Sequence, residues 1–569
     1  MNVHLVLLET AGNQGFIFGT NRMRENVGAS QLIYESCGLF VFETLRDIFK
    51  HQPRGSFPDI HKLSDLLDEG ANPPIQNQKN TGGVEIILAA SGKAMMLVRE
   101  QSLGEKIIQG VTRRVLRDAP GLDIHGIISK AFSLEKESLH KKIGDLHGDM
   151  GGVRAKLPSQ QLRFMRLPFV EPCETSGLPA SHHVLLNKEK YALSEASKSK
   201  WDAEARGSGR IKDLIARKGW KPIKNLNAMD ELPWLAVIHA DGNGLGKLFM
   251  AFNHCLGESE PGSDSSAEDW TRWNRRYIQT LGGFSRSLDD CCELAFQKAL
   301  AGVNDKGGDG KQLKLLPLVL GGDDLTVVCD GKIAVRFAKD FILQFEDATA
   351  NSKIIVECLE NFRAKKSGDP KDPSLDDMPS GRLTICAGIA IVKNHFPFHA
   401  AYELSEQLLK SAKRCKPGSA LDYHVLYDST GADLTRLRDA LLVDGGKSRL
   451  VSKPYTLGKS PGINVPLSRP FEKLEGDVEI IRREDEDEPG RRLLPNSKLH
   501  EFREALFLGK KRADALLKLV WDDYRGRGLE KLFPNQSFFE QVAGPETITH
   551  QTGLIDAMDL AGEFWESLT

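Results

Sequence analysis

Residues 315–329 read LLPLVLGGDDLTVVC, and this stretch decides the fold. Two apolar runs rich in Leu and Val flank two glycines and two aspartates. The pattern predicts two antiparallel strands joined by a tight turn at Gly321, Gly322, Asp323 and Asp324. Gly and Asp are common in any hairpin turn, so the tetrapeptide alone is also compatible with a turn that has no chemical role. The surrounding sequence has to decide between these two interpretations.

A further acidic residue follows another apolar run. Residues 234–240 read WLAVIHA and are followed by Asp241. A carboxylate at the end of one strand can converge with an acid pair in a hairpin on a neighbouring strand. Carboxylate oxygens are the ligands that Mg²⁺ and Mn²⁺ prefer, and these ions support nucleotidyl transfer by holding a triphosphate. We therefore expect Asp241, Asp323 and Asp324 to be catalytic metal ligands, and the two turn glycines to let a nucleotide approach closely.

The same order of elements is predicted twice along the chain. In the first block the apolar run at 3–8 ends in Glu9, and the string GGVEIILAA begins at Gly82 and Gly83, in apparent alignment with GGDDLTVVC. The sequence predicts an α+β protein with two copies of a βαββαβ unit. Helices are expected at about 28–50, 102–117, 267–300, 333–345 and 399–414, and further strands at 86–90, 122–128 and 383–392.

The loop at 242–247 reads GNGLGK and follows the strand that ends in an acid. It is not a P-loop, because its glycine spacing is one residue too short and Leu248 replaces the Ser or Thr that would bind Mg²⁺. Lys413, expected on the helix after the last strand of the block, is a candidate to neutralise a triphosphate, although a single helical lysine is about as often simply solvated. The residues expected to offer backbone N–H groups to phosphate oxygens are Gly242, Asn243 and Gly244.

The composition is that of an ordinary folded protein. The 569 residues are 40% hydrophobic and 27% charged, and the formal net charge is −2, so overall charge gives no attraction to nucleic acid. The nine cysteines form no C-x-x-C pair and several lie in apolar runs, which indicates reduced cysteines and a cytoplasmic protein. Neither a signal peptide pattern nor a run of roughly 18 apolar residues occurs.

Changes in composition predict four parts of the chain. The charged run at 482–490 is expected to be a solvated loop. The four parts are a first βαββαβ domain at 1–134, a linking insert domain at 135–230, a second βαββαβ domain at 231–427 and a helical C-terminal domain at 428–569.

Several of these strings, taken together, resemble a known family. They are QGFIFGTNRMRENVGASQLI at 14–33, ADGNGLGKLF at 240–249, LVLGGDDLTVV at 318–328 and AGIAIVKNHFPFHAAYELSEQLLKSAK at 387–413. This ordered set is similar to the large polymerase/cyclase subunit of type III CRISPR effector complexes, over most of the chain. The resemblance implies two ferredoxin-like palm domains, a linking domain and a helical C-terminal domain.

The resemblance also implies an activity in antiviral defence. In that family the paired palms bind two ATP molecules, and the palm with GGDD joins ATP into cyclic oligoadenylate messengers when the complex holds target RNA. By matching position, Asp241, Asp323 and Asp324 would hold Mg²⁺ or Mn²⁺, and Lys413 would contact phosphates. The implied partners are other effector subunits, guide RNA and target RNA. The residues expected near the ATP of the first palm are Ser30, Gly82 and Gly83.

Three departures from the family pattern change these expectations. The first palm strand starts at Val3 and no His-Asp dipeptide occurs, so no HD-type nuclease site is expected. Near Cys173, Ser176 stands where a second cysteine of the family's zinc site would fall, so no zinc ion is expected. The string GGVE at 82–85 lacks the paired acids, so the first palm is expected to bind nucleotide without catalysing.

Two other functions stay open from the sequence. A diguanylate cyclase also carries a GG[DE]EF hairpin in a palm, but those enzymes pair two identical domains, and here Leu325 stands where an aromatic residue is expected. A scaffold subunit with a vestigial GGDD turn is the second alternative, and the intact set of three aspartates argues against it.

Overall fold

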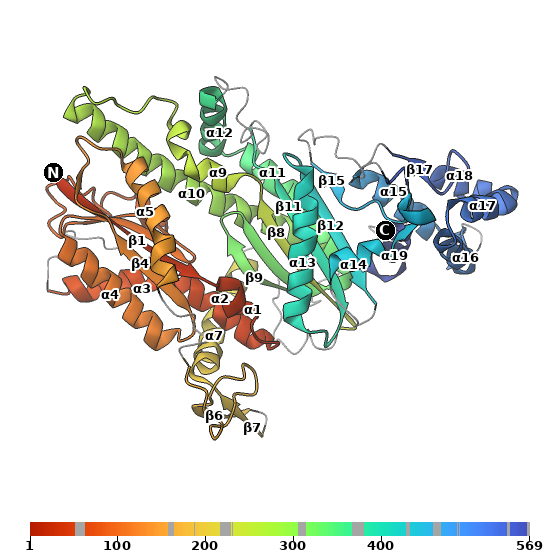
Figure 1. Cartoon of the computed structure of the whole chain (residues 1–569), viewed down its shortest axis with the longest axis horizontal. Helices are drawn as coiled ribbons and strands as arrows, with labels where there is room; N and C mark the ends of the chain where they lie inside the picture. Colours follow the sequence, from red (N-terminus) through yellow and green to blue (C-terminus); the bar gives the residue numbers. More distant parts are fainter. Residues whose placement is uncertain are drawn as a thin grey trace. The chain divides into compact units, whose positions relative to one another are not determined.

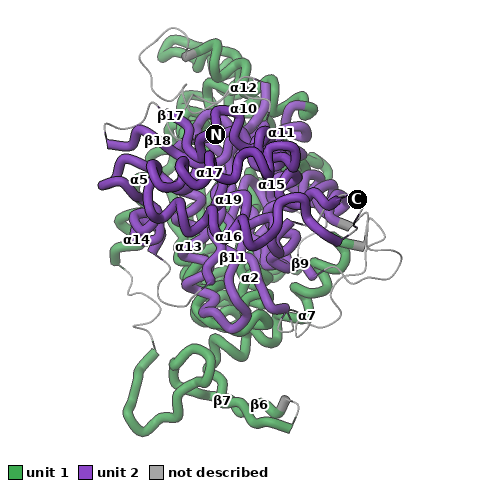
Figure 2. Tube along the Cα trace, turned by 90° about the vertical axis from the view of Figure 1, so that its right-hand side faces the viewer, with its two compact units in different colours: residues 1–219, 245–291, 351–372 green, residues 220–244, 292–350, 373–569 purple. Residues whose placement is uncertain are grey.

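The computed structural model describes residues 1–51, 63–156, 164–186, 188–216, 229, 232–304, 314–366, 381–427, 433–458, 468–485, 488, 490–542 and 547–565. These residues form two compact units, each assembled from separate stretches of the chain (Figure 2). Unit 1 contains residues 1–219, 245–291 and 351–372, and unit 2 contains residues 220–244, 292–350 and 373–569. No helix in the described ranges is long and apolar enough to cross a bilayer.

Unit 1 is built on an antiparallel sheet that includes the start of the chain. Its strands are β1 (Asn2–Ala11), β2 (Val84–Ala90), β3 (Lys93–Val98), β4 (Asp123–Ile128) and the short β5 (Phe132–Ser133). The strand order is β2-β3-β1-β4, with β5 paired to the beginning of β1. Residues 5–8 of β1 are fully buried, which explains their unbroken apolar sequence. This order, with the first strand inside the sheet, is that of a ferredoxin-like βαββαβ unit.

Helices pack on this sheet and around it. In unit 1 they are α1 (Asn13–Phe18), α2 (Met23–Cys37), α3 (Leu39–Phe49), α4 (Gln101–Asp118), α5 (Leu139–Ala155), α7 (Glu195–Ala216), α9 (Leu245–Met250) and α12 (Lys353–Lys366). The helices α3 and α4 lie side by side (Figure 1). Helix α4 buries Ile107, Val111 and Val115, which are spaced four residues apart along one face. The long α10 (Ala267–Asn304) belongs to unit 1 as far as Cys291 and to unit 2 thereafter.

Part of the expected linking region packs tightly on the first βαββαβ domain. A hairpin of β6 (His182–Leu186) and β7 (Glu189–Leu193) precedes α7. Helix α7 lies so close to α2 that a Cβ atom on Gly28 would stand 1.8 Å from the backbone oxygen of Lys200. The absence of a side chain at Gly28 therefore lets the two helices touch backbone to backbone.

Unit 2 is built on a larger sheet. Its strands are β8 (Trp234–Gly242), β9 (Leu315–Gly321), β10 (Asp324–Asp330), β11 (Ile385–Lys393), β12 (Ser419–Leu426), β15 (Tyr455–Leu457) and β16 (Arg469–Pro470), in the order β16-β15-β12-β11-β8-β10-β9. The four strands β11-β8-β10-β9 repeat the ferredoxin-like order of unit 1. The α+β fold class with two ferredoxin-like domains is thereby confirmed.

Two helices cover opposite faces of this second sheet. Helix α11 (Gly331–Ala350) follows β10, and α13 (Phe398–Ala412) follows β11. On β11, Ile391 lies against Gly331 at the start of α11, whereas Ala390 packs with Leu404 and Leu408 of α13. Alternate residues of β11 therefore contact different helices, which explains why almost the whole strand is apolar.

The C-terminal part combines helices with short strands. Its helices are α14 (Leu434–Asp439), α15 (Phe471–Arg482), α16 (Asn496–Phe507), α17 (Lys510–Tyr524), α18 (Leu529–Leu532) and α19 (Leu554–Asp559). A small sheet has the order β13-β14-β18-β17, formed by Leu442–Val443, Ser448–Arg449, His550–Gln551 and Glu540–Gln541.

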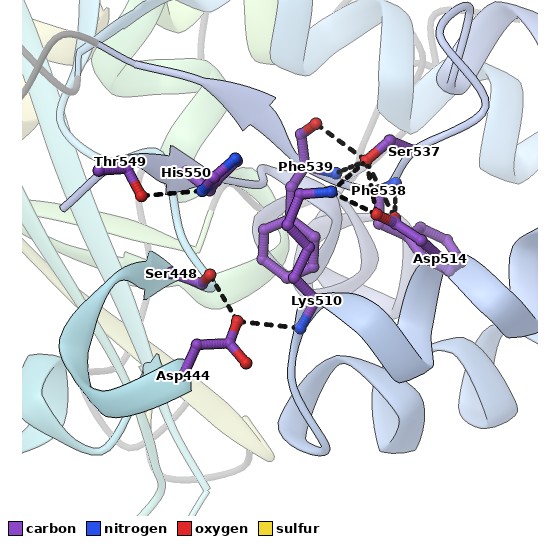
Figure 3. A network of polar contacts seen from close by, with 9 residues as sticks. All are labelled: Asp444, Ser448, Lys510, Asp514, Ser537, Phe538, Phe539, Thr549 and His550. Carbon is purple, nitrogen blue, oxygen red and sulfur yellow. Dashed lines mark hydrogen bonds and ion pairs between the residues drawn. The ribbon is translucent and has the colours of Figure 1, made fainter.

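A polar network ties α17 to these short strands (Figure 3). The carboxylate of Asp444 accepts hydrogen bonds from the Ser448 hydroxyl at 2.6 Å and from the backbone N–H of Lys510 at 3.0 Å. One turn into α17, Asp514 accepts a hydrogen bond from the Ser537 hydroxyl at 2.9 Å. Side chains far apart in sequence thus fix the first turn of α17, whose backbone N–H groups have no partner within the helix.

Several expectations about elements need correction. The helix expected at 28–50 is two helices, α2 and α3, separated by Gly38, which lies outside the helical region at φ −105° and ψ −88°. Strand β3 was not expected at all. The long helix expected at 267–300 is confirmed, and α16 and α17 lie in the part of the chain that was expected to be helical. All nine cysteines are buried and free, as their apolar surroundings predicted. Positions 486, 487 and 489 of the charged run lie outside the described residues.

Candidate active site

The GGDD hairpin joins β9 to β10 and brings two acids into register. Asp324 begins β10 and is the direct cross-strand partner of Asp241 on β8. Gly322 has φ +61°, in the left-handed region that favours glycine, and nothing lies within 4 Å of a Cβ built there. The turn itself therefore requires glycine at this position, and the predicted cross-strand convergence of these two acids is what the structure shows.

Asp324 lies in a partly enclosed position. Its side chain is 45% exposed as a whole, but its Oδ1 atom is enclosed and has no hydrogen-bond partner among the described residues. This oxygen lies 3.5 Å from Nδ1 of His239. Burial, with smaller contributions from the carboxylates of Asp323 and Glu406, raises the pKa of Asp324 to about 7.

His239 lies beneath the acids, on the same face of β8 as Asp241. It is 6% exposed, and its Nδ1 lies 3.1 Å from the hydroxyl of Thr326, its cross-strand partner. Burial lowers the pKa of His239 to about 4, so the imidazole is neutral at pH 7. His239 was not among the residues expected at the site, although its position two residues before Asp241 places both side chains on one face of a strand.

Asp241 is paired with a lysine. The ammonium of Lys413 contacts the carboxylate of Asp241 and lies 3.4 Å from the backbone oxygen of Gly242. Lys413 begins a short 3₁₀ turn directly after α13, not the body of the helix as expected. The structure thus brings Lys413 to the acids, on the sheet face that α13 covers.

The loop after Asp241 is held by internal hydrogen bonds. The amide of Asn243 is 1% exposed and donates to the Thr384 hydroxyl at 3.0 Å and to the backbone oxygen of Gly418 at 3.2 Å. The backbone N–H of Gly242 donates to the oxygen of Asp323, and that of Asn243 donates to the oxygen of Thr384. In this structure these two N–H groups are therefore not available to phosphate oxygens, and Asn243 fixes the loop.

The donor set suits a hard divalent cation only in part. Oxygen donors from Asp241 and Asp324 are the chemistry that Mg²⁺ and Mn²⁺ prefer, and the enclosed Oδ1 of Asp324 lacks a hydrogen-bond partner. The described residues contain no group of three His, Cys, Asp or Glu side chains close enough to hold a metal ion. At Asp241 the ammonium of Lys413 supplies the positive charge. A metal ion bound to both acids would therefore share the Asp241 carboxylate with Lys413 or take the place of the ammonium.

In the first palm, the hairpin that corresponds to GGDD is not the one that the sequence indicated. GGDD connects the second and third strands of its sheet, whereas the two glycines of GGVE precede the second strand, β2, which begins at Val84. The turn between β2 and β3 leads into Lys93. Lys93 is the cross-strand partner of Glu9, as Asp324 is of Asp241. The alignment of GGVE with GGDD is therefore wrong, because β3 was not recognised as a strand.

The position equivalent to the acid pair holds ion pairs in the first palm. Glu9 lies 3.9 Å from Nζ of Lys93 and 3.0 Å from Nη2 of Arg154 on α5. Burial lowers the pKa of Lys93, and Glu9 opposes that shift. A lysine thus stands where the second palm has its hairpin aspartate, which fits the expectation that catalysis belongs to the second palm.

Gly82, Gly83 and Ser30 take other positions in unit 1. Gly83 has φ +69°, and a Cβ on it would stand 3.3 Å from Cβ of Arg99, so both the turn and a close contact favour glycine. Ser30 lies in α2 and is 8% exposed. A role of these three residues in ATP binding stays a prediction.

Cys173, at the position of the family's zinc site, is surrounded by hydroxyl groups. Its Sγ lies 3.3 Å from Oγ1 of Thr175 and 3.5 Å from Oγ of Ser197. Burial raises the pKa of Cys173, but hydrogen bonds with Ser176, Ser197 and Thr175 outweigh it and lower the pKa to about 6.

Comparison with known proteins agrees with this geometry. Residues 234–420 match the family model described as Cas10/Cmr2, second palm domain. No curated protein matches the chain. Among solved structures, the apo type III-B Cmr-beta complex matches at TM-score 0.47 and 9% identity, covering 99% of this chain and 81% of that chain. Csm1 of T. onnurineus matches at TM-score 0.40 and 12% identity, and the match covers 99% of this chain and 70% of that chain.

A Csm1–Csm4 cassette in complex with cA4 matches at TM-score 0.40 and 14% identity, covering 90% of this chain and 64% of that chain. The chain therefore spans less than two thirds of that relative. The family match begins at the first residue of β8 and includes Asp241, the GGDD hairpin and Lys413. Residues 234–420 are thus similar to the second palm of the Cas10/Cmr2 family, which confirms the resemblance to the large subunit of type III CRISPR effector complexes.

Proposed function

We propose that the chain is the catalytic large subunit of a type III CRISPR effector complex, and that its second palm joins ATP into cyclic oligoadenylate when the complex holds target RNA. The observation that carries the proposal is the register of Asp241 with Asp324 at a Gly-Gly hairpin, within a sheet that matches the Cas10/Cmr2 second palm. The same resemblance supports other effector subunits, guide RNA and target RNA as partners.

The residues of the second palm have distinct proposed roles. Asp241 and Asp324, with Asp323 beside them, would hold Mg²⁺ or Mn²⁺. A bound divalent ion supplies charge neutralisation for a triphosphate and acidifies an attacking hydroxyl. In the transfer, a 3′-oxygen bonds to the α-phosphorus, pyrophosphate leaves and the hydroxyl proton is released to base. Lys413 would exchange its contact with Asp241 for a phosphate oxygen of ATP.

One observation favours a second candidate, a catalytically silent scaffold. Lys413 contacts Asp241, and no three-acid group lies close enough to hold a metal within the described ranges. If that ion pair is permanent, the positive charge of Lys413 opposes the binding of a metal ion at Asp241. The two functions predict opposite results in one experiment.

The test is incubation of the assembled complex with labelled ATP, Mg²⁺ or Mn²⁺ and cognate target RNA, followed by mass analysis. We expect ATP-derived oligomers from the wild type. Asp324→Asn keeps the size of the side chain but removes a charged ligand, and we expect product formation to fall about a hundredfold or more.

The matched control is Asp523→Asn, an exposed acid of α17 in the same unit. It should form product at the wild-type rate. A wild-type complex that assembles and binds target RNA but makes no ATP-derived product would favour the scaffold. Wild-type activity in Asp324→Asn would contradict the assignment of the site.

A further inference from the structure

A groove with basic walls lies between α3 and α4 in unit 1. Its volume is about 290 Å³. Thr44 and Gly110 bring the two helices into close contact, since a Cβ on Gly110 would stand 2.4 Å from Cγ2 of Thr44. The absence of a side chain at Gly110 lets the two helices approach each other. The longer side chains of α4 line the groove on either side of Gly110.

Four cations of α4 line this groove: Lys106, Arg113, Arg114 and Arg117. They follow one another at spacings of seven, one and three residues, which places them along one face of the helix. The buried apolar residues of α4 lie on the neighbouring face of the helix. Lys106, Arg113 and Arg117 are exposed and Arg114 is half-buried, so the basic stripe runs along the edge of the contact between α4 and α3.

Two of the four cations already have acidic partners. Arg114 contacts Asp47 of α3 and lies 2.9 Å from Oε2 of Glu43, and Arg117 lies 2.6 Å from Oδ2 of Asp118. These pairs fix the positions of the two guanidinium groups.

The other two cations have no such partner. Lys106 and Arg113 are exposed, and neither side chain forms an ion pair or hydrogen bond with any residue in the described ranges. At about 1.5 Å of rise per residue, roughly 10 Å of helix separates them, so they can reach two different anionic groups. Among the described residues, the groove therefore holds two cations without an ion-pair partner, beside two paired guanidinium groups and the carboxylate of Asp47.

We propose that this α3/α4 groove binds the phosphate backbone of a single RNA strand, independently of its base sequence. Guanidinium groups match phosphate geometry, and successive cations along a helix suit a chain of regularly spaced anions. Ile48 is the one apolar side chain in the lining, whereas a protein partner needs apolar anchors at the centre of an interface. The choice of RNA over other polyanions rests on the proposed function, which brings guide and target RNA to the complex.

The test uses the full chain and a fluorescent single-stranded RNA of about 20 nucleotides, with binding measured by anisotropy over a range of salt concentrations. For Lys106→Gln with Arg113→Gln we expect roughly tenfold weaker binding at low salt. The negative slope of log affinity against log salt should become less steep by about 1.4, because each phosphate contact to a single strand contributes about 0.7 to its magnitude.

The matched control is Lys130→Gln with Lys136→Gln, which removes the same charge from two exposed lysines of unit 1. It should bind RNA like the wild type. Equal loss in both double variants would show that net charge alone matters and would overturn the proposal. Competition by poly-glutamate as effective as competition by unlabelled RNA would overturn it in favour of an acidic protein segment. Neither result would alter the assay of nucleotide transfer, since α3 and α4 belong to unit 1 and GGDD to unit 2.

Discussion

Glu85 belongs to the GGVE string that the sequence aligned with GGDD, but in the structure it forms a buried ion pair. Its side chain is 3% exposed and accepts hydrogen bonds from Nη1 of Arg275 at 2.6 and 2.8 Å and from the backbone N–H of Ile75 at 2.7 Å. Burial raises the pKa of Glu85, and Arg275 opposes this shift. The buried carboxylate of Glu85 is tolerated because Arg275 and the backbone N–H of Ile75 donate hydrogen bonds to it.

Removal of Arg275 should therefore destabilise the region around β2. Arg275→Met leaves the Glu85 carboxylate buried without its ionic partner, which costs about 3–5 kcal/mol. We expect faster amide hydrogen exchange in β2 and a lower midpoint of thermal unfolding of the full chain. Arg272→Met is the matched control, because Arg272 lies on the same helix with a side chain 74% exposed. Equal exchange in both variants would contradict a stabilising role for the Glu85 pair.

At the scale of elements, the sequence predicted strands well where an acid or glycine marks their ends. β8, β9 and β10 are apolar runs bounded by Asp241 and the GGDD turn, so both their position and their pairing could be predicted. β3 was missed although Ser91 and Gly92 mark the turn before it, because Met95 and Met96 at its centre are not typical strand residues. Once β3 was missed, the glycine pair at 82–83 took the place of the true hairpin.

Contacts between distant elements could not be predicted from the sequence. Lys413 reaches Asp241 only because α13 crosses the face of β8, and Asn243 meets Thr384 only because β8 pairs with β11. The sequence around Lys413 or Asn243 does not indicate which distant residue its side chain will contact. His239 is the exception, because strand alternation alone places it with Asp241.

Asp559, the last residue of α19, is expected to make the free energy of unfolding depend on pH. Burial, partly opposed by Lys453 and Arg503, raises the pKa of Asp559 to about 6. Between about pH 4 and pH 6 the folded state therefore binds more protons than the unfolded state, so the free energy of unfolding falls as pH rises, by about 2 kcal/mol from this group. We expect Asp559→Asn to remove that part of the slope in thermal unfolding measured from pH 4 to 7. Asp523→Asn should leave the slope unchanged, and an unchanged slope in Asp559→Asn would contradict the assignment.

At the scale of the whole chain, the C-terminal region and the second palm are parts of one structure in unit 2. Strands β15 and β16 extend the palm sheet next to β12, although they lie beyond the residues expected to form that palm. Asp556 of α19 is fully buried and accepts hydrogen bonds from the N–H of Ser452 at 2.7 Å and from the Tyr455 hydroxyl at 2.9 Å. Its Oδ1 lies 3.2 Å from Nζ of Lys453, and that ammonium lies 3.7 Å from the ring centre of Tyr423 on β12.

This chain of contacts predicts that a change near the C-terminus loosens the palm sheet. Asp556→Asn leaves the buried Lys453 ammonium without its direct ion-pair partner, which costs about 3–5 kcal/mol and favours movement of Lys453 away from Tyr423. We expect faster hydrogen exchange in β12 and β15, and little change in β1 and β4 of unit 1, with Asp523→Asn as the exposed control. Adding Lys453→Met removes the unpaired charge and should restore much of the protection, because buried apolar volume replaces an ion pair at little cost. Protection of β12 in Asp556→Asn equal to that of the wild type would mean that the palm sheet holds together without α19.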